Sequence, residues 1–120
     1  MAIVEMWNYT IETPRNLDLT GFKVEATDGE IGKVDQATDV VGGSFLIVDT
    51  GPWIFGKKVM IPAGVVRDID PDTETIFVSR MKDEIKDAPE FDEKRLRDQE
   101  YRNELGGYYS RGEARSRQGL

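Results

Sequence analysis

Residues 22–37, FKVEATDGEIGKVDQA, decide the fold class of this chain. They predict two strands, Phe22 to Ala26 and Ile31 to Ala37. Asp28-Gly29 between them is a strong hairpin turn, because glycine accepts a positive φ angle at no steric cost. Gly32, inside the second strand, indicates a bulge or a sharp bend. The stretch therefore predicts a hairpin at the start of the fold.

Short strands and turns continue in the same way as far as Ser79. Further strands are predicted from Phe45 to Asp49, from Lys58 to Ile61, from Val65 to Ile69 and from Thr75 to Ser79. Six strands within about sixty residues, joined by hairpin-length links, favour a mainly-β fold, a small antiparallel β-barrel. No helix-length periodic segment lies among the strands, which argues against an α/β fold.

An N-terminal arm, residues 1–18, precedes the barrel domain, which is expected to span residues 19–91. Apolar residues nearly alternate from Val4 to Ile11, as in a strand, until Pro14 ends the pattern. Two interpretations stay open for this arm. It is either a flexible leader or a segment that packs Trp7 on the barrel or on a partner.

A charged helical extension, residues 92–120, follows the barrel. Before it, one or two helical turns are predicted from Lys82 to Asp87, ending before Pro89. Asp92 is then expected to cap a helix that runs to about Leu105 and ends at Gly106-Gly107. The polar remainder, Tyr108 to Leu120, is expected to be disordered when alone.

The charge of the chain argues against nucleic acid as a partner. The formal net charge is −7, and an acidic protein repels the phosphate backbone. Residues 92–120 are nearly balanced, with 7 basic and 6 acidic side chains, so RNA binding stays open only for this tail. The chain has no cysteine, which excludes disulfides and thiol chemistry and is typical of the reducing cytosol.

Catalysis is also disfavoured by composition. The chain has no histidine, the commonest general base and metal ligand. Acidic residues gather in and beside the predicted turns, where aspartate bonds to its own backbone, and this explanation is preferred to a weak cation site or to carboxylate catalysis. We therefore expect no enzyme activity, cofactor, metal site or small-molecule substrate, and assign no catalytic residue.

Nothing in the sequence predicts a membrane span. The longest run of aliphatic and aromatic residues, Phe45 to Val48, is far shorter than the ~20 residues that a spanning helix needs. The first residues, MAIVEM, contain an acidic residue and no basic one, unlike a signal peptide. A cytoplasmic location is expected.

Bulky residues outside the strands supply a candidate interaction surface. Trp53, Ile54 and Phe55 follow a proline in a loop, where they either fold over a barrel end or face a partner. Lys57 beside them either steers an acidic partner or guards a sheet edge. The predicted extension is either solvated or docked through Leu96, Tyr101 and Leu105. The candidate residues are Trp53, Ile54, Phe55, Lys57, Tyr101 and Leu105.

Three motifs in a fixed order resemble the PRC-barrel family: DGEIGKV at 28–34, FLIVDTG at 45–51 and FGKKVMIP at 55–62. The stretch KDEIKDAPEF at 82–91 is also similar to free-standing bacterial members. The resemblance implies a small β-barrel, as found in the reaction-centre H subunit and at the C-terminus of RimM-type ribosome-maturation factors. Stand-alone bacterial members, some linked to stress, fit this chain best.

The resemblance implies a non-catalytic protein-interaction module, without a catalytic residue set. Because small domains bury little surface, association with a second copy is expected, and the partner is another protein or the chain itself. The alternative is a ribosome- or RNA-associated factor that acts through the tyrosines and arginines of the C-terminal tail.

Overall fold

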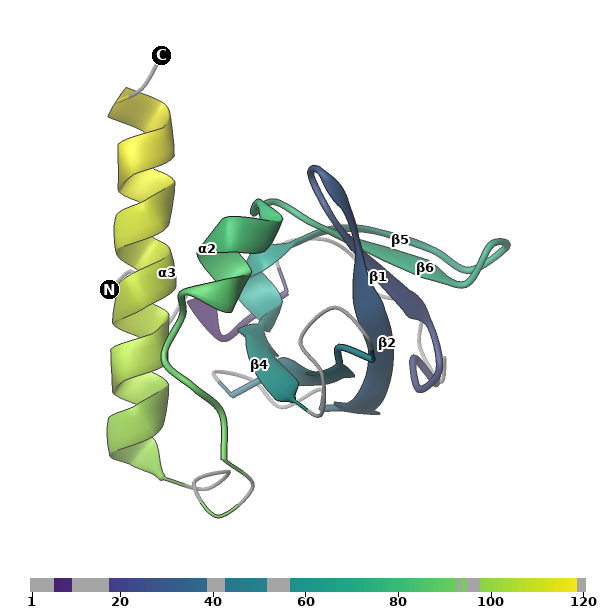
Figure 1. Ribbon diagram of the computed structural model, residues 1–120, viewed down its shortest axis with the longest axis horizontal. Coiled ribbons are helices and arrows are strands. Elements are labelled where there is room, and N and C mark those ends of the chain that lie inside the picture. The colour runs from purple at the N-terminus through teal and green to yellow at the C-terminus, as the bar shows by residue number, and fades with distance from the viewer. Residues whose placement is uncertain are drawn as a thin grey trace.

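The computed structural model of the protein describes residues 6–9, 18–38, 43–51, 57–92, 94 and 98–118. Six strands and two α-helices form its regular structure within these ranges (Figure 1). The strands are β1 (Lys23–Ala26), β2 (Gly29–Ala37), β3 (Phe45–Asp49), β4 (Lys58–Pro62), β5 (Val66–Asp70) and β6 (Thr75–Val78). A 3₁₀ turn, η1 (Ala63–Val65), precedes β5, and the helices are α2 (Lys82–Lys86) and α3 (Gln99–Gln118).

The mainly-β prediction is confirmed. The first and last residues of every predicted strand lie within two residues of those of the corresponding strand in the structure. The bulge expected near Gly32 is also present. Val24 and Glu25 of β1 face Gly32 and Glu30 of β2, so Ile31 is an extra residue on the second strand. Turn residues therefore located the strands correctly.

The six strands form one mixed sheet in the order β4-β3-β2-β1-β6-β5. Four neighbouring pairs are antiparallel, but β1 and β6 are parallel, so the prediction of a wholly antiparallel arrangement is wrong. A parallel pair needs a long crossover connection, and here β2 to β5 provide it. Local turn signals carry no information about this pairing, because its partners lie far apart in the sequence.

The sheet has to curl. In a flat sheet of six strands the outer two would lie roughly 24 Å apart, because neighbours are about 4.8 Å apart. The outer strands here are β4 and β5, and only the three residues of η1 separate them. A link of that length spans at most about 14 Å. The sheet therefore wraps around its interior (Figure 1), although no ladder joins β4 to β5 in the described part of the chain.

The interior of the curled sheet holds the hydrophobic core. Four of the five residues of β3 are buried, as expected for a strand at the centre of the core. Side chains with at most 1% exposure come from all six strands and include Val24, Ile31, Leu46, Val48, Ile61, Val66, Ile76 and Val78. Burial of a side chain of this size contributes about 1.5–3 kcal/mol.

The described part of the N-terminal arm packs on this core. Trp7 is 4% exposed, its carbonyl accepts a hydrogen bond from the Ser44 backbone amide, and its ring meets Phe45 edge-on. Packing of Trp7 on the sheet domain is therefore the correct one of the two interpretations. The predicted strand from Val4 to Ile11 lies mostly outside the described residues, and Met6 to Tyr9 contain no strand.

Helix α3 differs from the prediction at both ends. It begins at Gln99 and continues through Gly106-Gly107 to Gln118, into the tail that was expected to be disordered. Two glycines cost about 2 kcal/mol in a helix interior. Tyr101, Leu105 and Tyr109 form a stripe across them and are at most 1% exposed, and their burial outweighs that cost. In the described residues, no helix has both the length and the apolar character needed to cross a membrane.

Replacement of Gly32 by alanine should destabilise the fold strongly. Gly32 has φ +152°, and a Cβ atom there would overlap the Asp49 carbonyl oxygen on β3. We expect Gly32→Ala to lower the free energy of unfolding by roughly 3 kcal/mol or more. The control is Gly21→Ala, where φ is +88° but a Cβ would meet no atom within 4 Å, so only about 1 kcal/mol is expected. Urea denaturation measures both, and equal losses would contradict the close approach of β2 and β3.

Candidate interaction groove

A groove of about 210 Å³ lies between β4 and the segment that links α2 to α3. Its apolar and charged walls come from two stretches distant in sequence, residues 57–60 and 85–91. The lining residues are Lys57, Lys58, Val59, Met60, Ile85, Lys86, Ala88, Pro89, Glu90 and Phe91. Val59, Ala88 and Phe91 are only partly buried, so the groove offers apolar surface to solvent.

The β4 wall is fixed by the end of β3. The Thr50 hydroxyl and backbone amide both donate to the Lys57 carbonyl, at 2.8 and 3.3 Å, and hold Lys57 where β4 begins. The next residue, Lys58, pairs through Nζ with the Asp35 carboxylate at 3.1 Å. The lysine side chains are thus set on the sheet, while their ammonium groups stay near solvent.

An ion pair joins the two walls. Lys57 Nζ lies 2.6 Å from Glu90 Oε1, and the two side chains are 48% and 72% exposed. A pair so exposed contributes at most about 1 kcal/mol, because water screens it and two long side chains must be ordered. Another carboxylate could therefore replace Glu90 at little cost.

The opposite wall begins with α2, which has only five residues and depends on its surroundings. The Asp28 carboxylate accepts from the Lys82 amide at 2.8 Å, and the Glu84 carboxylate accepts from the Met81 amide at 3.1 Å. Ile85, 2% exposed, anchors the helix in the core. These contacts place Lys86 and Ala88 opposite β4.

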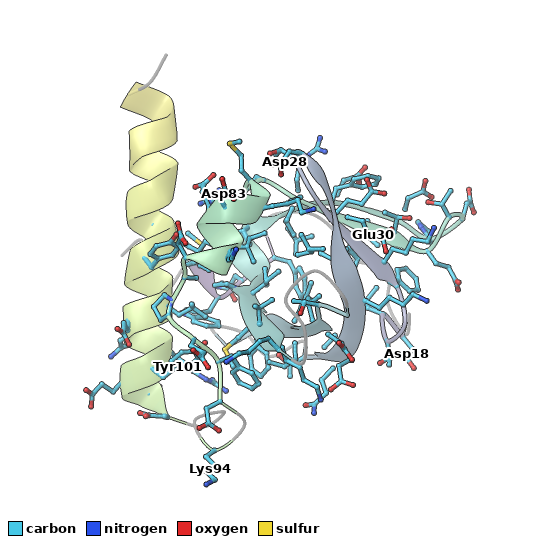
Figure 2. All side chains as sticks on the ribbon, in the orientation of Figure 1. Asp18, Asp28, Glu30, Asp83, Lys94 and Tyr101 are labelled. Atoms are coloured by element: carbon cyan, nitrogen blue, oxygen red, sulfur yellow. The ribbon has the colours of Figure 1, made fainter. Side chains whose placement is uncertain are left out.

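Helix α3 supports this wall from behind. The Tyr101 hydroxyl donates to the Pro89 carbonyl at 3.2 Å, and the Tyr108 hydroxyl donates to the Glu84 carbonyl at 2.6 Å. The rings of Phe91 and Tyr101 are 6.2 Å apart between centroids. Figure 2 shows Tyr101 between α3 and the rest of the fold. Helix α3 therefore holds this wall of the groove in place.

A buried arginine fastens α3 to the end of β6. Arg80 is 4% exposed and donates from Nη2 to the Tyr109 carbonyl at 2.9 Å and from Nη1 to Ser79. The Tyr109 ring lies 5.9 Å from the guanidinium carbon. In the described part of the chain the Tyr109 hydroxyl has no hydrogen-bond partner, and burial raises the pKa of this phenol well above its usual range.

The structure distributes the predicted interaction residues unevenly. Lys57 lies at the groove, whereas Trp53, Ile54 and Phe55 fall outside the described residues. Tyr101 and Leu105 have 0% exposure and belong to the chain's own core, so their assignment to a binding surface is wrong. Their spacing of four, extended to Tyr109, was the signal that the helix has a buried stripe.

The acidic turns form local hydrogen bonds where the structure describes them. The Asp70 carboxylate accepts from the amides of Asp72 and Thr73, and the Asp49 carboxylate accepts from Gly51. Among the described residues, no group of three or more acidic side chains is arranged to hold a metal ion.

A larger hollow of about 430 Å³ adjoins Gly32 and Gly51. Its lining residues come from β2 and from the end of β3, and they include Glu30, Lys33 and Asp49. Among the residues that the structure describes, Ile31 is the one large apolar residue lining it, and Ile31 is 1% exposed. The groove beside β4 is thus the better candidate for binding.

Comparison with known proteins adds no relative, since no family model and no curated protein matches the sequence. The resemblance to the PRC-barrel family therefore stays a prediction from the sequence motifs.

Two tyrosine variants should change stability in opposite directions. Tyr109→Phe removes a buried hydroxyl that has no partner in the described structure, so we expect the free energy of unfolding to rise by about 1 kcal/mol. Tyr101→Phe removes the hydrogen bond to Pro89 and should lower it by about 0.5–1.5 kcal/mol. Urea denaturation at pH 7 compares them, and losses of equal size would show that Tyr109 has a partner.

The buried phenol of Tyr109 should make the protein less stable at alkaline pH. A tyrosine hydroxyl in the unfolded chain ionises near pH 10, whereas burial keeps Tyr109 protonated at higher pH. The unfolded state then binds fewer protons, so the free energy of unfolding falls as the pH rises above about 10. In Tyr109→Phe this fall should be shallower. Urea midpoints at pH 8 and pH 11 test it, and identical slopes for both proteins would contradict the buried phenol.

Proposed function

We propose that the protein is a non-catalytic interaction module with the architecture of a PRC-type β-barrel, and that it associates with itself. The groove between β4 and Ile85 to Phe91 carries the proposal. Apolar side chains that are half-buried in one chain gain free energy when a second protein covers them.

The barrel part of the proposal is supported by the curl of the sheet. Strands β4 and β5 are its two ends, and η1 brings the end of one beside the start of the other. A barrel brings the two edges of a sheet together in this way. The motifs quoted from the sequence also lie on β2, β3 and β4, in the order that the family resemblance requires.

The size of the groove implies that a contact extends beyond it. A stable interface uses roughly 20–30 residues on each partner, and only ten of the described residues line the groove. Met81, the N-cap residue of α2, is 50% exposed but does not line the groove. Self-association through this face should therefore be weak and depend on concentration.

The alternative function, RNA binding through the tail, is weakened because two of the tail's aromatic residues are buried. Base stacking needs exposed rings. Tyr101 and Tyr109 are at most 1% exposed and hold α3 on the sheet, and Tyr108 donates to the Glu84 carbonyl. These contacts weigh against a stacking role for the tail.

Sedimentation equilibrium between about 10 μM and 1 mM tests self-association through the groove. We expect the average mass of the wild type to rise with concentration. Ala88→Trp fills the groove and should keep the protein monomeric, because a larger side chain excludes the partner. Ala37→Trp changes a partly buried alanine at the end of β2, outside the groove, and should associate like the wild type.

Circular dichroism first establishes that both variants are folded, and Ala88→Leu replaces Ala88→Trp if that variant is not. A wild type that stays monomeric throughout would refute self-association. An Ala88→Trp variant that assembles as the wild type does would move the contact away from the groove.

A further inference from the structure

The groove has more basic than acidic lining residues on an acidic protein, although Lys57 is paired with Glu90 and Lys58 with Asp35. Three lysines and one glutamate lie among its lining residues, whereas the whole chain has a net charge of −7. Lys57 and Lys86 are exposed, so their charges reach solvent at the two walls. A partner for this groove should therefore present carboxylates.

This charge decides how two copies can meet. A two-fold symmetric contact would place the same patch of both copies face to face. If the two-fold axis passed through the groove, Lys57 and Lys86 would lie near the same lysines of the second copy, and like charges at an interface cost free energy. Self-association through the groove is consequently favoured in a head-to-tail arrangement, with an acidic surface of the second copy in the groove.

The same chain carries a suitable acidic element. The end of β5 and the turn that joins it to β6, residues 68–74, contain four acidic residues and no basic one. Asp68, Asp72 and Glu74 are exposed, while the Asp70 carboxylate is engaged by turn amides. Figure 1 shows this hairpin projecting from the fold on the side away from α3. It is thus placed to reach another molecule.

We propose that the groove of one copy binds the β5–β6 turn of a second copy, with Asp72 and Glu74 meeting Lys57 and Lys86. The inference rests on the proposed self-association and specifies its geometry. The incoming carboxylates compete with Glu90 for Lys57, whose present ion pair is exposed and weak. Because each copy has one groove and one turn, the contact repeats and forms chains or rings.

Neutral variants of each surface test the contact. Lys57→Gln/Lys86→Gln removes the charge of the groove, and Asp72→Asn/Glu74→Gln removes that of the turn. The dissociation constant for self-association of each double variant should be roughly tenfold higher than that of the wild type, because two exposed ion pairs are lost. Both should therefore need roughly tenfold higher concentrations than the wild type to reach the same average mass.

A mixture of the two double variants gives the sharper result. One variant keeps an intact turn and the other an intact groove, so a 1:1 mixture should reach the mass of two chains and no more. Glu90→Gln, which removes the competing carboxylate, should strengthen assembly. Lys23→Gln/Lys33→Gln and Asp18→Asn/Glu30→Gln make the same charge changes at exposed positions elsewhere and should assemble like the wild type.

The outcomes separate this inference from the proposed function. If the double variants assemble like the wild type, or if their mixture stays monomeric, the head-to-tail contact is refuted. Should Ala88→Trp still abolish assembly in that case, self-association through the groove stands with another occupant. A wild type that is monomeric at every concentration refutes both.

Discussion

The three residues of η1 impose the constraint on which the rest of the structure depends. They join the two outer strands of one sheet, so the sheet has to curl until β4 and β5 approach each other. The curl encloses the core and turns β4 into an edge at the surface. Helix α2, the segment that ends at Phe91 and helix α3 pack over that edge. The groove is the space that remains between β4 and these elements.

Helix α3 shows how a buried stripe outweighs local preference. Gly106 and Gly107 favour an end to the helix, yet the stripe formed by Tyr101, Leu105 and Tyr109 needs the helix to continue. The same residues that stabilise the helix also position the groove, because the Tyr101 hydroxyl holds Pro89 and Arg80 holds the Tyr109 carbonyl. Stability of the core and the shape of the candidate site are therefore linked through one helix.

Local and distant interactions explain what the sequence could predict. The strands were located to within two residues because glycine, proline and aspartate mark turns through their own backbone preferences. The parallel pairing of β1 with β6 was missed, since it joins segments separated by four other strands. For the site, Lys57 was found from its place beside a loop. Lys86 and Ala88 were not, because only the docking of α2 brings them opposite β4.

Net charge and local charge act in opposite directions on the association proposed here. A charge of −7 on each copy opposes any encounter, and this general repulsion is screened within about 10 Å at 0.1 M salt. The lysines of the groove and the carboxylates of the β5–β6 turn attract at contact distance, where screening is less complete. Moderate salt therefore removes more of the repulsion than of the attraction. An acidic surface with one basic groove disfavours random contacts between copies while it permits one orientation, so the charge that keeps the chains apart also makes their contact specific.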